Sequence, residues 1–201
     1  MTETTTIQET NQLFPVFLKL EQLKLLIVGA GNVGLEKLHA VLQNSPATSI
    51  TVVAPEIKED VKALTEKYTN ISIVESVYDE VLLNDADLVI VAVNDKILGE
   101  QIRSDAHERG LLVNVADTPD LCDFYLGSIV RKGNLKVAIS TNGKSPTIAK
   151  RLKEAFTEML PEELDDVLHN MESIRKKMNG SIEKKVHELN HITKVLAVKD
   201  I

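Results

Sequence analysis

The chain of 201 residues has little cysteine, few aromatic residues and no long apolar run. Its single cysteine, Cys122, excludes an internal disulfide and a cysteine cage for a metal ion. Aromatic residues make up only 3% and Trp is absent, so the interior must be built mostly from Val, Ile, Leu and Ala. The longest purely apolar run, 88–93, is far shorter than the roughly 20 residues that span a bilayer. We therefore expect no membrane partner.

A secretion signal is also lacking at the N-terminus. Residues 1–12 are polar and slightly acidic, without the basic start and apolar stretch of a signal peptide, so we expect a loose leader and a cytoplasmic protein. The net charge of −7 argues against nucleic acid as a partner, because proteins that bind it usually have a basic surface.

Acidic residues are absent from one long segment, 124–153, although Asp and Glu number 30 in the whole chain. We expect this acid-free segment to bind a ligand with many negative charges. The alternative is an ordinary solvated surface, since Lys and Arg commonly cover a helix face. Lys150, Arg151 and Lys153, however, lie in the early turns of the helix expected from Pro146, where positive charge opposes the helix dipole. This placement favours an anionic partner. The seven basic residues of the segment are Arg131, Lys132, Lys136, Lys144, Lys150, Arg151 and Lys153.

Apolar runs alternate with helical patterns over the first part of the chain. This order predicts right-handed crossovers and an α/β fold with a Rossmann-type doubly wound parallel sheet. We expect strands at 25–28, 49–54, 71–74, 88–93 and 111–115, and helices at 33–43, 57–68 and 97–109.

The pattern changes after this unit. Two β-rich runs, 128–131 and 135–140, flank Lys132-Gly133-Asn134 and predict a hairpin. Ser145-Pro146 then supplies a capping hydroxyl and a proline suited to the first helical position. Helices are expected from there to about residue 198, with breaks near Pro161 and near residues 179–180.

A glycine-rich motif, Gly29-Ala30-Gly31-Asn32-Val33-Gly34, lies between the first expected strand and the first expected helix. In this context the three glycines permit a tight turn, approach of a pyrophosphate and close helix packing. The helix N-terminus offers free N–H groups to the phosphates. The alternative is a glycine turn that binds nothing.

The end of the second expected strand bears on the choice between NAD and NADP. It runs Ala54-Pro55-Glu56, so no acid stands directly at the tip, and Glu56 is the local candidate for the ribose hydroxyls. No Lys or Arg stands at the tip to bind a 2′-phosphate, although Lys58 is near. We therefore expect NAD.

Polar residues follow the fourth and fifth expected strands, whose carboxyl ends should line the ligand crevice. Asn94 and Asp95 follow the fourth, and Asp117 follows the fifth, where it is the best-placed proton acceptor. The alternative is that Asp117 caps the turn into Thr118-Pro119. The five histidines lack metal-ligand spacing, so we expect no metal site; the alternative is a site at His187 and His191, which are four residues apart on a charged terminal helix. The absence of Tyr-x-x-x-Lys argues against a short-chain dehydrogenase.

Four further segments stand out besides the glycine motif. They are Phe14-Pro15-Val16-Phe17-Leu18, Asn114-Val115-Ala116-Asp117, Asp120-Leu121-Cys122-Asp123-Phe124-Tyr125 and Ala138-Ile139-Ser140-Thr141-Asn142-Gly143-Lys144-Ser145-Pro146. Together these five motifs resemble the precorrin-2 dehydrogenase family, which includes the dehydrogenase/ferrochelatase domain of sirohaem synthases. The resemblance covers about residues 13–160, and we expect the stand-alone form because the chain ends at Ile201.

The resemblance implies NAD-dependent oxidation of precorrin-2 to sirohydrochlorin in sirohaem biosynthesis, followed in some members by Fe²⁺ chelation. It also implies a homodimer in which the segment after the Rossmann unit exchanges between subunits. We therefore expect a Rossmann domain at 1–116, a dimerisation segment at 117–150 and a helical domain at 151–201.

The resemblance also implies roles for single residues. Asp117 would be the catalytic carboxylate, and Asn32, Val33, Pro55 and Glu56 would contact NAD. From the glycine motif and the end of the fourth strand we also expect Gly29, Gly31, Gly34 and Asn94 to bind the cofactor. The anionic tetrapyrrole suits the acid-free segment, in which we expect Ser140, Lys144, Lys150 and Arg151 to bind it; some members carry a phosphorylated serine at the position of Ser140.

Two other functions remain open at this point. An NAD-sensing regulatory module would bind NAD without reducing it, but would not explain the acid-free segment. A chelatase that keeps the Rossmann fold only as a scaffold would form no NADH from precorrin-2.

Overall fold

The computed structural model of the chain describes residues 10–179 and 181–193. These form two compact units, one ending at Gly127 and including Asn142–Lys144, the other made of Ser128–Thr141 and the chain from Ser145 onward. The division describes compactness alone, and the three expected domains stay a prediction. Most of the expected leader and the last expected helical residues lie outside the described part.

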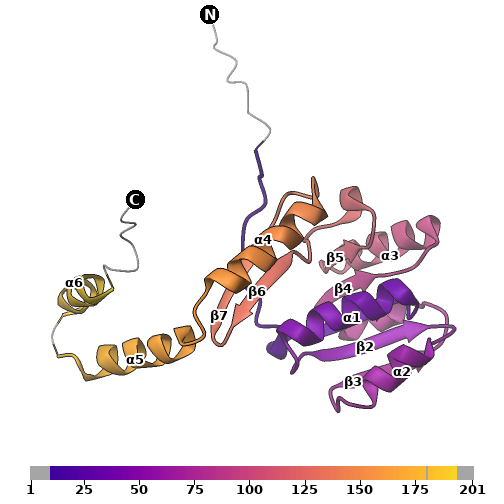
Figure 1. The fold of residues 1–201 in the computed structure, drawn as a ribbon. Coiled ribbons are helices and arrows are strands. Elements are labelled where there is room, and N and C mark those ends of the chain that lie inside the picture. The colour runs from indigo at the N-terminus through magenta and orange to yellow at the C-terminus, as the bar shows by residue number, and fades with distance from the viewer. Residues whose placement is uncertain (1–9, 180, 194–201) are drawn as a thin grey trace, which may run out of the picture. The chain divides into compact units, whose positions relative to one another are not determined.

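The first unit contains a five-stranded parallel sheet with the order β3-β2-β1-β4-β5 (Figure 1). This confirms the predicted doubly wound fold. The largest difference from the prediction is in the fourth strand, because β4 ends at Val91, before the expected residue 93, and Val93 lines a cavity. The strands are β1 Lys24–Val28, β2 Ser49–Ala54, β3 Ile71–Glu75, β4 Leu88–Val91 and β5 Leu112–Val115.

Helices cover both faces of this sheet, so alternate residues of β1 enter two different clusters. Leu25 and Ile27 pack with α1 (Asn32–Asn44) and α2 (Glu59–Thr65). Leu26 and Val28 pack against α3 (Lys96–Glu108) and the 3₁₀ helix η2 (Glu80–Asp85) on the other face. Burial on both sides explains why β1 and β4 are almost wholly apolar.

Helix α2 is shorter than the expected helix at 57–68. Ile57 is buried in the core ahead of the helix, and Lys58 is its extended N-cap residue. At the other end the helix stops at Thr65, whose hydroxyl donates to the Lys62 carbonyl, and the chain turns through Tyr68. The apolar periodicity thus continued beyond both helix ends.

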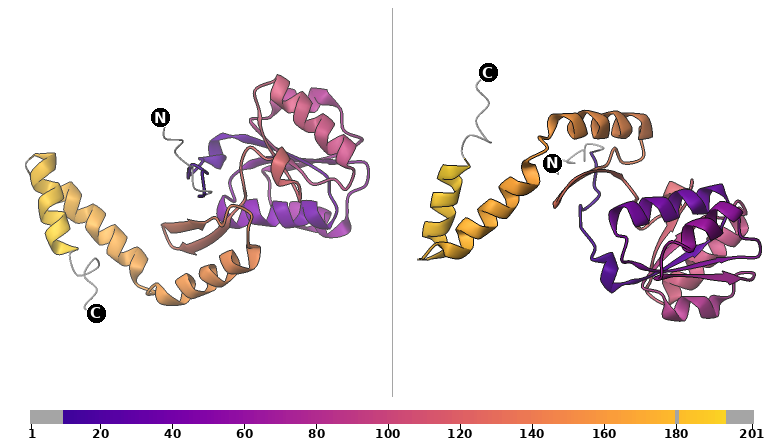
Figure 2. Two further views of the ribbon diagram at one scale, coloured as in Figure 1. Left: turned by 90° about the horizontal axis from the view of Figure 1, so that it is seen from above. Right: turned by 60° about the horizontal axis from the view of Figure 1, so that its bottom comes forward.

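The second unit begins with the predicted hairpin, formed by β6 (Ser128–Lys132) and β7 (Leu135–Ile139). Helix α4 (Pro146–Met159) packs along the hairpin (Figure 2). The Ser145 hydroxyl accepts from the Ile148 amide at 3.2 Å, which confirms the predicted cap. Helices α5 (Leu164–Lys177) and α6 (Ile182–Ile192) follow. Among the described residues, no helix combines the length and the apolar composition of a membrane span.

The turn of the hairpin is bound by the start of α5. The Asp165 carboxylate accepts from the Asn134 backbone amide at 2.7 Å and from the Asn134 side chain at 2.9 Å. These hydrogen bonds, the backbone one foremost, lower the pKa of Asp165. Lys132 also pairs with Glu162, just ahead of α5. The hairpin and α5 are therefore joined by polar contacts as well as by the chain.

Candidate functional site

The three motif glycines have different surroundings between β1 and α1. Gly29 has a φ of +109° and packs so closely on the Ala92 carbonyl that a β-carbon would overlap it. A β-carbon on Gly34 would likewise overlap the Gly29 carbonyl. At Gly31, by contrast, a β-carbon would meet nothing within 4 Å. Two of the glycines are required by packing, whereas Gly31 leaves open space above the loop.

Helix α1 begins at this open space. Gly31 is its N-cap residue and makes no side-chain cap, and the first helical hydrogen bond runs from the Leu35 amide to the Gly31 carbonyl at 2.9 Å. The amides of Asn32, Val33 and Gly34 precede that bond, as in the first turn of any helix, and point toward the N-terminal end. They offer an anion such as a pyrophosphate a set of donors and the positive end of the helix dipole.

The expected ribose-binding residues lie next to this loop in the fold. Pro55 and Glu56 are exposed directly after β2, and in the described part of the chain the Glu56 side chain makes no hydrogen bond or ion pair. The Lys58 ammonium donates to the Asn32 side-chain oxygen at 2.9 Å and pairs with Asp60 at 2.7 Å. A carboxylate and an ammonium therefore both stand beside the nucleotide loop.

A cavity of about 170 Å³ lies at the carboxyl ends of β4 and β5. It brings together three of the expected site residues, Val33 from α1, Asn94 after β4 and Asp117 after β5. This is the edge of a doubly wound sheet at which ligands bind. Sequence analysis did not single out three other residues of the lining, Lys96, Glu100 and Thr118, although the start of a helix after β4 could have indicated the first two.

Asp117 has an unusual backbone at this cavity, with a φ of +58°. Such a conformation costs a non-glycine residue free energy and persists only where neighbouring contacts hold it. The Ala116 amide donates to the Val91 carbonyl at 2.9 Å, and the Thr118 amide donates to the Val115 carbonyl at 3.3 Å. Hydrogen bonds on either side thus fix the position from which the Asp117 side chain projects.

The carboxylate of Asp117 is exposed and, within the described residues, has no hydrogen bond or ion pair. Asp95 at the neighbouring strand end differs, because its carboxylate accepts from the amides of Ile97 and Leu98 at 2.9 and 3.2 Å and caps α3. Within the described residues the Asp117 side chain makes no such capping bond. The Asp117 carboxylate is left with both oxygens available to a ligand or a proton.

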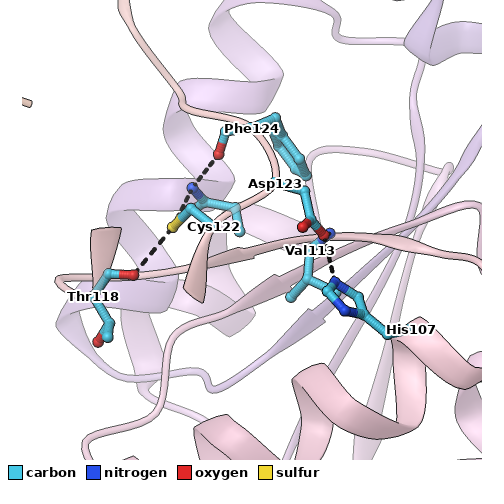
Figure 3. Close-up of polar contacts among 7 residues, drawn as sticks. His107, Val113, Thr118, Cys122, Asp123 and Phe124 are labelled. Carbon is cyan, nitrogen blue, oxygen red and sulfur yellow. Dashed lines mark hydrogen bonds and ion pairs between the residues drawn. The ribbon is translucent and has the colours of Figure 1, made fainter. Parts of the chain in front are cut away.

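Polar residues of the 114–125 motifs fix the chain that follows Asp117. The Asn114 side chain donates to the Phe124 carbonyl at 2.8 Å, and the Cys122 thiol contacts the Thr118 carbonyl (Figure 3). The thiol also donates to the Val115 carbonyl at 3.1 Å. Burial raises the pKa of the Cys122 thiol, so that it stays a protonated donor at neutral pH. Sequence analysis missed these roles, although polar residues recurring just after a buried strand were a signal.

The acid-free segment has charged residues on the exposed surface of α4. Arg151 pairs with Glu154 at 2.9 Å, one turn along the helix, whereas Lys150 makes no ion pair within the described chain. Ser140 follows β7, and Lys144 is exposed ahead of α4. All residues that line the cavity belong to the first unit. The substrate-binding roles of these four residues stay predictions.

Two histidines make specific contacts. The His107 ring lies 2.8 Å from the Asp123 carboxylate, and the His169 ring lies 2.9 Å from the Asp165 carbonyl. In the described part of the chain, no three His, Cys, Asp or Glu side chains are grouped so as to hold a metal ion.

Comparison with known proteins identifies two consecutive segments. Residues 16–128 match the family model described as "Putative NAD(P)-binding", and residues 132–159 match that of the sirohaem biosynthesis protein central region. A solved structure of SirC, precorrin-2 dehydrogenase, superposes with a TM-score of 0.72 at 25% identity, covering 94% of this chain and 90% of SirC.

Curated relatives are longer than this chain. Siroheme synthase from Psychrobacter cryohalolentis is 40% identical over 149 residues, which cover 74% of this chain and 28% of the relative. Siroheme synthase from Psychromonas ingrahamii is 38% identical over 149 residues, covering 73% of this chain and 30% of the relative. The chain thus spans less than a third of the length of either relative. Because the first family model covers more than half of its residues, the chain belongs to this NAD(P)-binding family.

Proposed function

We propose that the chain is a cytoplasmic enzyme that oxidises precorrin-2 to sirohydrochlorin with NAD as the hydride acceptor. The observation that carries the proposal is the position of the Asp117 carboxylate, which is unpaired within the described residues. Asp117 lines the same cavity as Val33, at the start of α1. A nucleotide site and a free base at one sheet edge are what a dehydrogenase needs.

The loop after β1 fits a dinucleotide. Gly31 leaves room for the pyrophosphate, and the first amides of α1 donate to it. Glu56 binds the ribose hydroxyls, which favours NAD over NADP, and Asn94 binds the nicotinamide end beyond β4. When bound, NAD supplies the hydride-accepting ring.

Asp117 accepts the proton that must leave precorrin-2 as a hydride departs, so that the oxidation yields sirohydrochlorin, NADH and a proton. Its carboxylate is exposed and makes no hydrogen bond in the described chain, so that both oxygens can accept the proton. The left-handed backbone directs this side chain from a fixed point on the cavity wall. A fixed base in reach of the reacting atom contributes about 10²–10⁴-fold to a rate.

The choice of substrate is supported by the matched proteins and by charge. The matched structure is named a precorrin-2 dehydrogenase, and the matched relatives are named siroheme synthases. Precorrin-2 is a tetrapyrrole with many carboxylates, and Lys144, Lys150 and Arg151 would bind them along with the Ser140 hydroxyl. The exposed Ile148, Leu152 and Met159 of α4 would be covered in a homodimer.

The test is NADH formation from precorrin-2 by the wild type and by Asp117→Asn, which keeps the shape of the side chain and removes its basicity. We expect turnover to fall about 10²–10⁴-fold in the variant while NAD and the tetrapyrrole still bind. A wild type that binds NAD and forms no NADH with precorrin-2 would instead be a sensor or a chelatase. Fe²⁺ added together with sirohydrochlorin separates these two, because only a chelatase inserts the metal. The same assay of Asp117→Asn shows whether Asp117 also takes pyrrole protons.

A further inference from the structure

Asp123 pairs with Val113 through both its backbone and its side chain. The Asp123 amide donates to the Val113 carbonyl, and the Val113 amide donates to the Asp123 carboxylate, each at 2.8 Å. Because β5 is the last strand of the sheet, the groups of Val113 that point away from β4 have no strand to bind. Asp123 takes the place of that missing strand.

The same carboxylate oxygen has a second partner on α3. The His107 Nε2 lies 2.8 Å from it, near the end of the helix, and the two side chains are 36% and 22% exposed. The carboxylate therefore joins the chain after Asp117 to both the edge strand and the helix beneath it (Figure 3).

A further contact closes the same segment. The Cys122 thiol lies 3.1 Å from the Val115 carbonyl and 3.4 Å from the Thr118 carbonyl. The chain thus leaves β5 at Val115 and returns to Val113 at Asp123, so that residues 116–122 form a loop closed at both ends. Asp117 lies in this loop, and Thr118 and Leu121 from the loop line the cavity with it.

We propose that Asp123 is a positioning residue for Asp117, acting through its bonds to Val113 and His107. This inference rests on the proposed function, in which Asp117 is the base. The loop returns to the sheet at Asp123, only six residues after Asp117. We call the bonds of Asp123 to Val113 and His107 the anchor of the loop; without this anchor the residues that follow Asp117 can move. A displacement of about 1 Å at a reacting group can cost roughly 10²-fold in rate.

A purely structural role for Asp123 makes different predictions. Lower stability would reduce the folded fraction, and so would reduce NAD binding and turnover together. A positioning role lowers kcat and leaves the Kd of NAD and the KM of precorrin-2 nearly unchanged, because the glycine loop lies elsewhere in the first unit.

Four variants test the proposal. We expect Asp123→Ala to lower kcat about 10- to 100-fold with an unchanged Kd for NAD. Asp123→Asn keeps an oxygen acceptor for the Val113 amide and should restore turnover to within about fivefold of the wild type. Asp120→Ala removes the same charge from the same loop, and as its carboxylate makes no contact within the described residues it should leave turnover unchanged. Asp123→Ala combined with Asp117→Asn should be no slower than Asp117→Asn alone.

If Asp123→Ala slows the Asp117→Asn enzyme by the same factor as it slows the wild type, the proposal is overturned. A fully active Asp123→Ala, or an Asp123→Asn as slow as Asp123→Ala, would also overturn it. If Asp117→Asn itself is fully active, both the base assignment and the positioning role fail.

Amide hydrogen exchange tests the anchor without any substrate and so separates its failure from failure of the proposed reaction. The Val113 and Thr118 amides should exchange at least about 10-fold faster in Asp123→Ala than in Asp120→Ala. Equal exchange in the two variants would overturn the proposal even if precorrin-2 is oxidised. If exchange is faster in Asp123→Ala but the wild type forms no NADH from precorrin-2, the anchoring of the loop by Asp123 is supported and the proposed reaction is refuted.

Discussion

The α-carbon of Gly34 lies against the carbonyl oxygen of Gly29, so closely that a β-carbon at position 34 would overlap this oxygen. The helix α1 thereby starts in direct contact with the turn that leaves β1. The contact lies within the protein and needs no ligand. Gly34 is therefore required by packing, whereas Gly31 has open space where a β-carbon would lie.

This difference predicts opposite effects of the same substitution. Gly34→Ala should lower the free energy of unfolding by about 1–3 kcal/mol, because the added methyl group overlaps backbone that cannot move freely. Gly31→Ala should change it by less than about 1 kcal/mol, since its β-carbon meets nothing within 4 Å. Urea unfolding of the two variants measures the difference. Equal stabilities would show that the turn adapts.

A charge at Gly31 should remove cofactor binding without unfolding the protein. Gly31→Asp places a carboxylate in the open space beside the first amides of α1, where the pyrophosphate is expected to bind. We expect no measurable NAD binding by calorimetry and a melting temperature close to that of Gly31→Ala. NAD binding of unchanged affinity in the folded variant would refute the assignment of the glycine loop.

The left-handed backbone of Asp117 allows its chemistry and its conformation to be separated. Asp117→Gly removes the carboxylate and relieves the cost of a φ of +58°, so the protein should be as stable as the wild type or more stable by up to about 1 kcal/mol. Turnover should fall at least as far as in Asp117→Asn. A less stable but fully active Asp117→Gly would assign this residue to the turn alone. Thermal melts and NADH formation on one preparation give both quantities.

Charge reversal at Lys150 tests the acid-free segment. Lys150→Glu should weaken tetrapyrrole binding about 3- to 10-fold, a modest effect because the side chain is exposed and its contacts are screened. NAD affinity should not change. The matched control is Lys67→Glu, which makes the same change of net charge at an exposed position after α2.

Salt gives a second measurement of the same interaction. Tetrapyrrole binding to the wild type should weaken as the ionic strength rises, and this dependence should be smaller for Lys150→Glu than for Lys67→Glu. Identical affinities and salt dependences for both variants would mean that Lys150 is an ordinary surface residue.

The pair formed by Tyr78 and Asp105 predicts a loss of stability at alkaline pH. Burial of the phenol, aided by its 2.9 Å hydrogen bond to the Asp105 carboxylate, raises the pKa of Tyr78 well above its ordinary value of 10.0. The unfolded chain ionises this tyrosine above about pH 10, whereas the folded protein does not, so its contribution to stability is full below pH 10 and is lost as the pH rises further. Tyr78→Phe should flatten the fall in unfolding free energy between about pH 9 and pH 11. An equally steep fall in Tyr78→Phe would contradict the pKa shift.

Most of the fold could be predicted from the sequence because its signals are local. The apolar runs of β1 and β4 and the glycine motif between β1 and α1 depend on burial and sterics that neighbouring residues already specify. The position of Asp117 at the carboxyl end of β5 followed from the order of elements.

The roles of the residues after Asp117 could not be predicted in this way. Asp123 binds a strand residue ten positions earlier and a helix residue sixteen positions earlier, and no periodicity records such pairings. The lengths of α2 and β4 also escaped prediction, because apolar residues beyond their ends pack or line a cavity without belonging to the helix or strand.

The bonds between Asp123 and Val113 have a consequence for how the protein behaves at high concentration. A strand at the end of a sheet normally presents amides and carbonyls that can pair with a strand of another molecule. On β5 the outward amide and carbonyl of Val113 are already bound to Asp123, and the Val115 carbonyl is bound to the Thr118 amide. The loop that holds Asp117 therefore occupies backbone groups of β5 with which a strand of another molecule could pair, and so opposes edge-to-edge aggregation on this side of the sheet.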